Sequence, residues 1–153
     1  MVKLVANPTF ADVKDVLVVV DGSQASVEAV ELACRLARRR KGGVYATYVI
    51  EVERSLPLDA ELAQETTAGE EALRQAKATG KRYDHHVEVA LLQARDAAQA
   101  LVSEAMERGV DAIIMGIDYE RPYGEFQLQR IALQLLKHAP CQVWICRRRL
   151  EET

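Results

Sequence analysis

Two short polar segments carry the side chains best suited to holding a small ligand. Asp21-Gly22-Ser23 follows one apolar run, and Met115-Gly116-Ile117-Asp118 completes another. Carboxylates accept hydrogen bonds, a serine hydroxyl donates and accepts them, and glycine lets the backbone approach a ligand closely. If the two runs are neighbouring parallel strands, the segments meet at the carboxyl edge of the sheet, where such folds bind ligands. This edge is therefore the candidate site.

The same side chains do not have the pattern of a hydrolase or of a metal site. Ser23 lacks the G-x-S-x-G elbow, and no histidine is expected near it. His85 and His86 point to opposite faces of a strand, so they cannot share one ion. His138 lies near a helix end, where it suits the negative end of the helix dipole. We therefore expect no catalytic residue and no metal ligand.

The three cysteines, Cys34, Cys141 and Cys146, are odd in number and show no C-x-x-C spacing. We interpret them as reduced thiols without a chemical role. The first 30 residues carry no signal-peptide pattern, and the apolar run 16–20 is too short to span a membrane. These features favour a cytoplasmic location.

The elements that must position the candidate site alternate between strands and helices. Apolar and β-branched runs predict strands at residues 16–20, 44–50, 86–91, 112–115 and 143–146. Helical spacing of apolar residues predicts helices at 24–40, from about 59–62 to 79, from 97 to 108, and at 128–138. Residues 1–12 are expected to form a leader with a turn at Asn7-Pro8, and residues 51–61 and 116–126 to form loops.

The predicted helix ends rest on capping signals. Ser23 and Asp96 suit helix N-termini, and Asp96 has Gln99 three residues later, as in a capping box. Gly80 and Gly109 are expected to end the second and third helices, and Pro140 prevents the fourth from continuing. The second helix has a poor apolar stripe, so we expect it to pack loosely.

The hydropathy of the strands sets their order in the sheet. The runs 16–20 and 112–115 are continuously apolar, which is typical of central parallel strands covered on both faces. Residues 86–91 alternate, which favours an edge strand. With right-handed crossovers, these conditions predict one α/β domain over residues 1–153. It has an open five-stranded parallel sheet of order 3-2-1-4-5 with helices on both faces.

Composition excludes several classes of partner. The 153 residues are 49% hydrophobic and 28% charged, as in an ordinary globular protein, so wholesale disorder is not expected. The formal net charge of −3 gives no electrostatic basis for binding nucleic acid or an anionic membrane. With only 5% aromatic residues, base-stacking surfaces are also not expected.

Four segments in one register resemble the universal stress protein family, and the resemblance spans nearly the whole chain. They are Val18-Val19-Val20-Asp21-Gly22-Ser23, Tyr48-Val49-Ile50-Glu51, Val110-Asp111-Ala112-Ile113-Ile114-Met115-Gly116 and His138-Ala139-Pro140-Cys141. The resemblance implies a fold like that of the adenine nucleotide alpha hydrolases. It also implies a role in the response to stress.

Members of that family that bind ATP carry a glycine signature after the fourth strand: Gly, two residues, Gly, nine residues, Gly, then Ser or Thr. Laid on this chain from Gly116, the second position is Tyr119, the third is Gln129 and the hydroxyl position is Arg130. Three of the four signature positions therefore differ. The chain resembles the members that do not bind ATP, and we expect no cofactor.

The residues around the altered signature argue both ways about phosphate. Asp118 and Glu120 place carboxylates where a triphosphate would lie, and like charges repel at short range. Arg121 and Arg130 could instead pair with a phosphate. If an adenine nucleotide such as ATP binds, the resemblance assigns its contacts to Asp21, Val49, Gly116, Arg121 and Arg130.

Two of those assignments have simpler alternatives. Asp21 can cap the first helix beside Ser23, and Val49 can be an ordinary residue of a core strand. Both alternatives are compatible with the spacing.

The last predicted strand contains Val143, Trp144 and Ile145, yet it is expected at an edge of the sheet. An apolar edge is hazardous unless another strand pairs with it or a segment covers it. The resemblance implies a homodimer in which this strand runs antiparallel to its twin. We expect these three residues at the interface, with Trp144 as an anchor.

Three functions follow from the resemblance. The first is a cytosolic, non-catalytic stress-response protein that acts through homodimerisation and contacts with an unidentified protein. The second is an adenine-nucleotide (ATP or AMP) binding protein or weak ATPase with a remodelled phosphate loop. The third is a regulatory domain attached to a membrane transporter.

Overall fold

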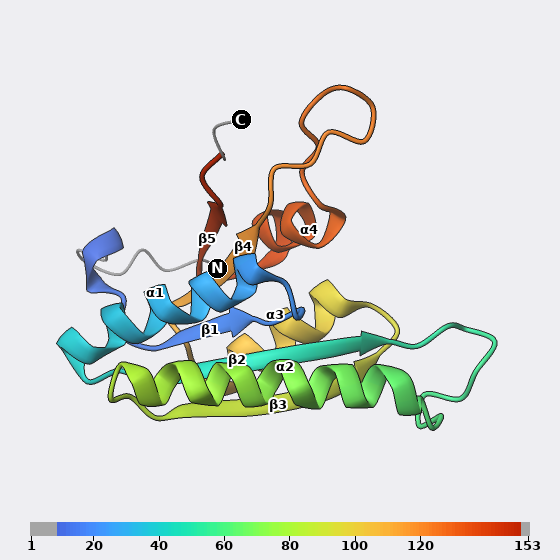
Figure 1. Ribbon diagram of the computed structural model, residues 1–153, viewed down its shortest axis with the longest axis horizontal. Coiled ribbons are helices and arrows are strands. Elements are labelled where there is room, and N and C mark those ends of the chain that lie inside the picture. Colours follow the sequence, from blue (N-terminus) through green and yellow to red (C-terminus); the bar gives the residue numbers. More distant parts are fainter. Residues whose placement is uncertain (1–8, 151–153) are drawn as a thin grey trace, which may run out of the picture.

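The computed structural model describes residues 9–150, which form an α/β layer structure (Figure 1). The strands are β1 (Val16–Val19), β2 (Val44–Glu51), β3 (Val87–Ala94), β4 (Ala112–Ile117) and β5 (Gln142–Arg147). The helices are the short 3-10 helix η1 (Phe10–Asp12), α1 (Gln24–Arg40), α2 (Ala63–Arg82), α3 (Ala97–Arg108) and α4 (Arg130–His138). The predicted turn at Asn7-Pro8, and most of the predicted leader, lie outside the described residues.

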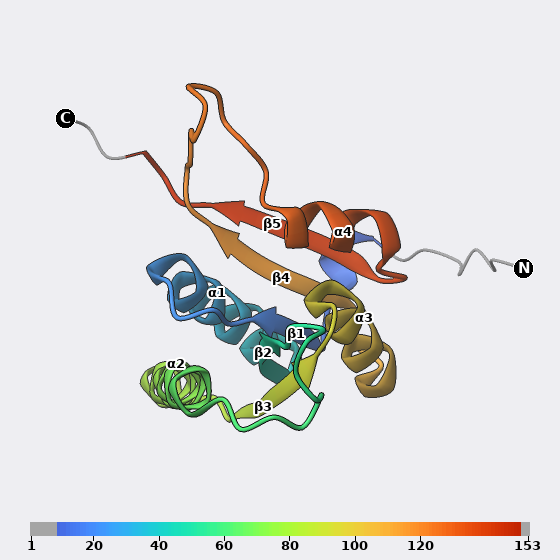
Figure 2. The same ribbon diagram turned by 90° about the vertical axis from the view of Figure 1, so that its right-hand side faces the viewer.

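The five described strands form one parallel sheet in the order β3-β2-β1-β4-β5, which confirms the predicted topology. Val16–Val19 of β1 pair with Val44–Thr47 of β2 on one side and with Ala112–Met115 of β4 on the other. Figure 2 shows α1 and α2 on one face of the sheet and α3 and α4 on the opposite face. The chain therefore reverses its winding direction at β1 and β4.

The core has two parts, one on each face of the sheet. Alternate residues of β1 supply both: Val16 and Val18 pack beneath α1 and α2, and Leu17 and Val19 pack beneath α3 and α4. All four side chains are buried, which explains the continuous apolar run. Burial of a Val or Leu side chain stabilises the fold by about 1.5–3 kcal/mol. The central strands are therefore a rigid base for the edge above them.

The second helix departs from the prediction at its end and in its packing. Gly80 lies inside α2, which continues to Arg82, so its assignment as the helix stop was wrong. A Cβ at Gly80 would lie 2.6 Å from the carbonyl oxygen of His85 and from a methyl group of Val87. The glycine instead permits close contact between α2 and the start of β3. The expectation of loose packing was also wrong, because small residues of α2 are buried, among them Gly69, Ala72 and Ala76.

The sequence predicted Gly116 in the loop after the fourth strand. In the structure it belongs to β4 instead. A Cβ added to it would lie 2.1 Å from the carbonyl oxygen of Ala25 in the first turn of α1. Any side chain at this position would push α1 away from the sheet. Gly116 therefore has a packing role, whatever the edge beyond it binds.

Candidate functional site

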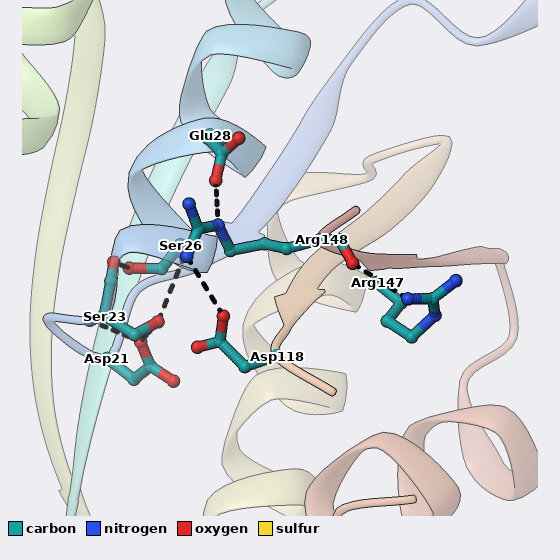
Figure 3. A network of polar contacts seen from close by, with 7 residues as sticks. All are labelled: Asp21, Ser23, Ser26, Glu28, Asp118, Arg147 and Arg148. Atoms are coloured by element: carbon teal, nitrogen blue, oxygen red, sulfur yellow. Dashed lines mark hydrogen bonds and ion pairs between the residues drawn. The ribbon is translucent and has the colours of Figure 1, made fainter. Parts of the chain in front are cut away.

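The turn between β1 and α1 is held by a chain of short polar contacts (Figure 3). Oδ1 of Asp21 accepts hydrogen bonds from the backbone N–H of Ser23 at 2.9 Å and from its hydroxyl at 2.5 Å. Ser23 is the N-cap of α1, and its Oγ accepts the backbone N–H of Ser26 at 3.2 Å. Asp21 thus orients the residue that caps the helix, and it remains exposed at the carboxyl edge.

Arg148 crosses the same edge from the end of β5. Its Nε donates to Oε2 of Glu28 on α1. Its Nη1 lies 3.4 Å from Oδ1 of Asp118, just after β4. Its backbone N–H donates to the carbonyl oxygen of Ile117 at 2.8 Å, which fixes the position of the chain. We call the contacts of Arg148 with Glu28 and Asp118 the Arg148 bridge. The hydrogen bond with Glu28, followed by that with Asp118, raises the pKa of Arg148 above its ordinary value, so the guanidinium stays charged.

Residues 118–129 form a loop that closes on itself and projects beyond β4 and α4 (Figure 1). The rings of Tyr119 and Phe126 stack with centroids 5.3 Å apart, and the guanidinium of Arg147 lies 5.5 Å from the Tyr119 ring centroid. Nε and Nη2 of Arg121 donate to the carbonyl oxygen of Gly124 at 3.0 and 2.6 Å. Aromatic and arginine side chains therefore shape a loop in which ATP-binding relatives are expected to have glycines.

The predicted site residues do not all meet. Asp21 and Asp118 lie at the edge together with Arg148, as Figure 3 shows. Arg121 is bound within its own loop, and Arg130 is exposed in the first turn of α4, with no ion pair among residues 9–150. The structure therefore gives neither arginine a contact with the edge.

The position of Val49 is informative because β1 is shorter than β2. The last contact from β1 to β2 is the hydrogen bond from the N–H of Val20 to the carbonyl oxygen of Thr47, at 2.9 Å. Alternate residues of a strand direct their backbone groups to the same side, so those of Val49 point past the end of β1. Its side chain packs into the core beneath α3 and α4. The backbone of Val49 therefore faces the edge at which Asp21 lies.

Glu28 and Arg148 were not among the predicted site residues. From the sequence alone, the run Arg147–Arg149 is typical of a solvated tail or of a dimer rim, and the ion pairs of Arg148 exclude the solvated tail for that residue. No local pattern pairs residues 28, 118 and 148, because the contacts depend on how β5 returns beside β4. The one available signal was a cluster of arginines directly after an apolar strand at the ligand edge.

The outer edge of β5 is the other predicted functional feature. Trp144 packs against the core beneath α1, whereas Val143 and Ile145 pack against the core beneath α3 and α4. The indole N–H of Trp144 donates to Oε1 of Gln142 at 2.9 Å. Within the described residues β5 pairs only with β4, so its other edge has no strand beside it.

Two further properties concern residues 9–150 as a whole. No helix in this part of the chain is both long and apolar enough to cross a membrane. Within the same residues, no group of three or more His, Cys, Asp or Glu side chains lies close enough to hold a metal ion.

The topology and the edge define an open, doubly wound α/β protein with a candidate ligand edge where β1 and β4 diverge. Residues 12–147 match the model of the universal stress protein family, and the chain belongs to that family. It is 27% identical over 145 residues to the universal stress protein MJ0531 of Methanocaldococcus jannaschii, covering 91% of this chain and 85% of that one.

Solved structures support the same fold. A universal stress protein from Archaeoglobus fulgidus superimposes with a TM-score of 0.75 at 21% identity, covering 86% of this chain and 97% of that chain. A structure of the universal stress protein from Archaeoglobus fulgidus in complex with dAMP gives a TM-score of 0.70 at 19% identity, with coverage of 86% and 96%. These likenesses establish the α/β architecture, and the sequence match establishes the family.

Proposed function

We propose that this protein is a cytosolic, non-catalytic stress-response protein that acts as a homodimer and through contacts with another protein. The observation that carries the proposal is the loop after β4. Its stacked Tyr119 and Phe126, with Arg147 against them, take the place of a glycine cradle. Asp118, held by Arg148, adds negative charge where phosphates would lie. A loop of this kind suits protein contacts better than phosphate binding, because exposed tyrosine and arginine are typical of interfaces.

The dimer is supported by the edge of β5. β5 has four apolar residues in a row, 143–146, and among residues 9–150 one of its sides is unpaired, which makes it a template for another strand. A two-fold axis brings two copies of the same edge together and makes the interface self-complementary. Trp144 supplies the large side chain expected at the centre of such an interface.

A second function, binding of an adenine nucleotide, is favoured by a different observation. The backbone of Val49 points past the end of β1, beside the exposed Asp21, so both residues are available to a base and a sugar. A relative of the same fold was solved with dAMP, which carries a single phosphate. A monophosphate needs fewer phosphate contacts than ATP. Binding of AMP is therefore the form of this alternative that the geometry supports best.

Absorbance distinguishes the two functions at low cost. The purified protein is denatured, the polypeptide is removed by filtration, and the ultraviolet spectrum of the filtrate is recorded. For a protein that works through protein contacts, we expect no absorbance maximum near 260 nm. A maximum at that wavelength equivalent to about one adenine per chain would establish the nucleotide-binding function and overturn the first.

A further inference from the structure

An open groove lies at the amino edge of the sheet, at the end of the molecule opposite the candidate site. It has a volume of about 560 Å³, and η1 forms one side of it with Phe10 and Asp12. Asp111, Pro140 and Cys141 contribute to its lining from the segments that lead into β4 and β5. The amide nitrogen of Gln142 donates to the carbonyl oxygen of Thr9 at 3.2 Å and ties η1 to the start of β5.

The groove has an acidic and an apolar part. Oδ2 of Asp111 accepts the backbone N–H groups of Lys14 and Asp15, and no ion pair found among residues 9–150 includes Asp111. Its carboxylate is therefore fixed in place with no cation beside it. The Phe10 side chain is 78% exposed, which leaves a large apolar surface at the rim. An occupant of this groove should carry a positive charge next to an apolar side chain.

The described chain ends with a segment of that chemistry. Arg149 is exposed and Leu150 is 56% exposed, directly after β5. Figure 2 shows the chain leaving β5 at its carboxyl end and running away from the body. Within one copy, this segment and the groove lie at opposite ends of β5, so the segment cannot reach its own groove.

Symmetry brings the two together in the proposed dimer. Two copies of the β5 edge related by a two-fold axis must run antiparallel. When the two sheets join into one, the faces that carry α4 lie on the same side, so odd-numbered residues stand opposite odd-numbered ones. The axis then passes at a residue, and because the middle of β5 (Gln142–Arg147) falls between Trp144 and Ile145, we place it at one of these two. In the first case Arg149 stands opposite Ala139 of the partner subunit, and in the second it stands opposite Cys141 of the partner subunit.

We propose that the groove receives Arg149 and Leu150 of a second copy of this chain. The guanidinium of Arg149 pairs with Asp111 of the partner subunit, and Leu150 covers apolar surface near Phe10 of the partner subunit. The contact occurs twice, once at each end of the paired strands. The inference rests on the proposed dimer. It gives a role to the groove and to the segment 149–150, which pairing of the two β5 strands alone does not explain.

Cysteine cross-linking tests the contact directly, because Cys141 already lies in the groove. The variant Arg149→Cys is made in a Cys146→Ala background, oxidised with diamide and run on a non-reducing gel. We expect a covalent dimer that disappears on reduction. The same protein with Cys141→Ala should give none, because two copies of residue 149 lie at opposite ends of the interface. Arg54→Cys, on the exposed loop after β2, is the matched control and should not cross-link.

Charge reversal gives a second measurement that does not depend on new thiols. Arg149→Glu should weaken the dimer severalfold in sedimentation equilibrium, and the effect should shrink as salt is raised. Arg54→Glu makes the same change far from β5 and should leave the dimer unchanged. Both arginines are exposed, so neither change is expected to disturb the fold.

The outcomes separate the inference from the function on which it rests. A wild-type protein that sediments as a monomer at high concentration overturns both the dimer and the groove contact. A wild-type dimer whose Arg149→Cys variant fails to cross-link, or cross-links without Cys141, overturns the groove contact alone. A cross-link that requires both residues supports it.

Discussion

Gly116 and Asp21 lie at the ligand edge, and each also supports the fold next to it. Gly116 leaves room for the carbonyl oxygen of Ala25, and Asp21 holds the residue that caps α1. Their presence in the sequence is therefore explained without a ligand. Arg148 resembles them in joining α1 to the end of β4, and it does so through charge. The Asp21 carboxylate and the Arg148 guanidinium at this edge therefore already contact other residues of the protein.

The packing role of Gly116 predicts a large effect of a single methyl group. Gly116→Ala places a Cβ where the Ala25 carbonyl now lies, so α1 must shift. We expect a loss of about 2 kcal/mol or more in the free energy of unfolding, measured by urea denaturation. Gly109→Ala is the control, because a Cβ there meets nothing within 4 Å and only the φ of +64° is unfavourable. It should cost about 1 kcal/mol. Equal losses for the two variants would contradict the packing role.

The thiol of Cys34 gives a prediction about pH. Burial, and to a lesser degree the nearby Glu31, raises the pKa of Cys34 to about 11. The folded state therefore disfavours the thiolate relative to the unfolded state. This thiol adds no pH dependence to stability below pH ~8.5, where it is protonated in both states. Above that pH the unfolded state loses the proton first, so the free energy of unfolding falls as pH rises toward 11.

A thiol titration with Ellman's reagent at pH 8 checks this. We expect Cys34 to stay unreactive in the folded protein and to react only after denaturant is added. The variant Cys34→Ala should lose the denaturant-dependent thiol. Three thiols reacting at similar rates in the folded protein would show that Cys34 is accessible.

At the scale of elements, the loop after β4 depends on contacts from β5. Arg147 lies against Tyr119, and Arg148 holds Asp118 at the start of the loop. Both arginines lie about 30 residues further along the chain than the loop residues they contact, so β5 must be in place before the loop is fixed. The loop is thus coupled to the strand that we propose as the dimer edge.

Removal of the Arg148 bridge should loosen this loop more than it destabilises the protein. We expect Arg148→Ala to speed chymotrypsin cleavage within residues 118–129, which contain Tyr119, Tyr123 and Phe126. The free energy of unfolding should change little, because the bridge is exposed to solvent and its ion pairs are screened. Arg54→Ala removes an exposed arginine far from β5 and should leave the cleavage rate unchanged. Unchanged cleavage in Arg148→Ala would show that the stacked rings alone hold the loop.

Local patterns predicted the strand order because burial on both faces leaves a readable signal. The continuous run 16–20 and the alternating run 86–91 identified a central strand and an edge strand correctly. Patterns failed where a residue served a distant neighbour. Gly80 had the appearance of a helix stop, but it makes room for the start of β3. The partners of Arg148 lie 120 and 30 residues away, so no window of sequence could reveal the bridge.

At the scale of the whole molecule, the two edges of the sheet differ. β3 lies beside α2, and its Glu88 pairs with Arg108 of α3. Charged side chains on an edge oppose pairing with another strand. β5 instead presents Val143, Trp144 and Ile145. The difference predicts that the molecule associates through β5.

A lysine introduced on β5 tests whether the protein associates through this strand. Ile145→Lys places an ammonium group at or beside the proposed two-fold axis, where it is buried against the partner strand and lacks a counterion. We expect the variant to sediment as a monomer under conditions in which the wild type is a dimer. The matched control is Leu92→Lys on β3, a substitution of the same kind at the other edge. If Leu92→Lys dissociates the dimer and Ile145→Lys does not, the interface lies at β3.

The most important prediction is that the loop after β4 does not bind phosphate. A variant with the family's phosphate signature serves as the positive control for measuring ATP binding. In this variant, Tyr119→Gly, Gln129→Gly and Arg130→Ser restore the family's phosphate signature. We expect the triple variant to bind ATP more tightly than the wild type. That result would show that the rest of the scaffold can hold a nucleotide.

Calorimetry of the wild-type protein with ATP and Mg²⁺ is the decisive measurement. The stacked rings of Tyr119 and Phe126 fill the loop, and Asp118 repels phosphate, so we predict no binding heat at millimolar ATP. This result would support a role in protein contacts. A dissociation constant in the low micromolar range would contradict that role. It would also show that the loop opens to hold phosphates, with Arg121 and Arg130 as the first residues to test.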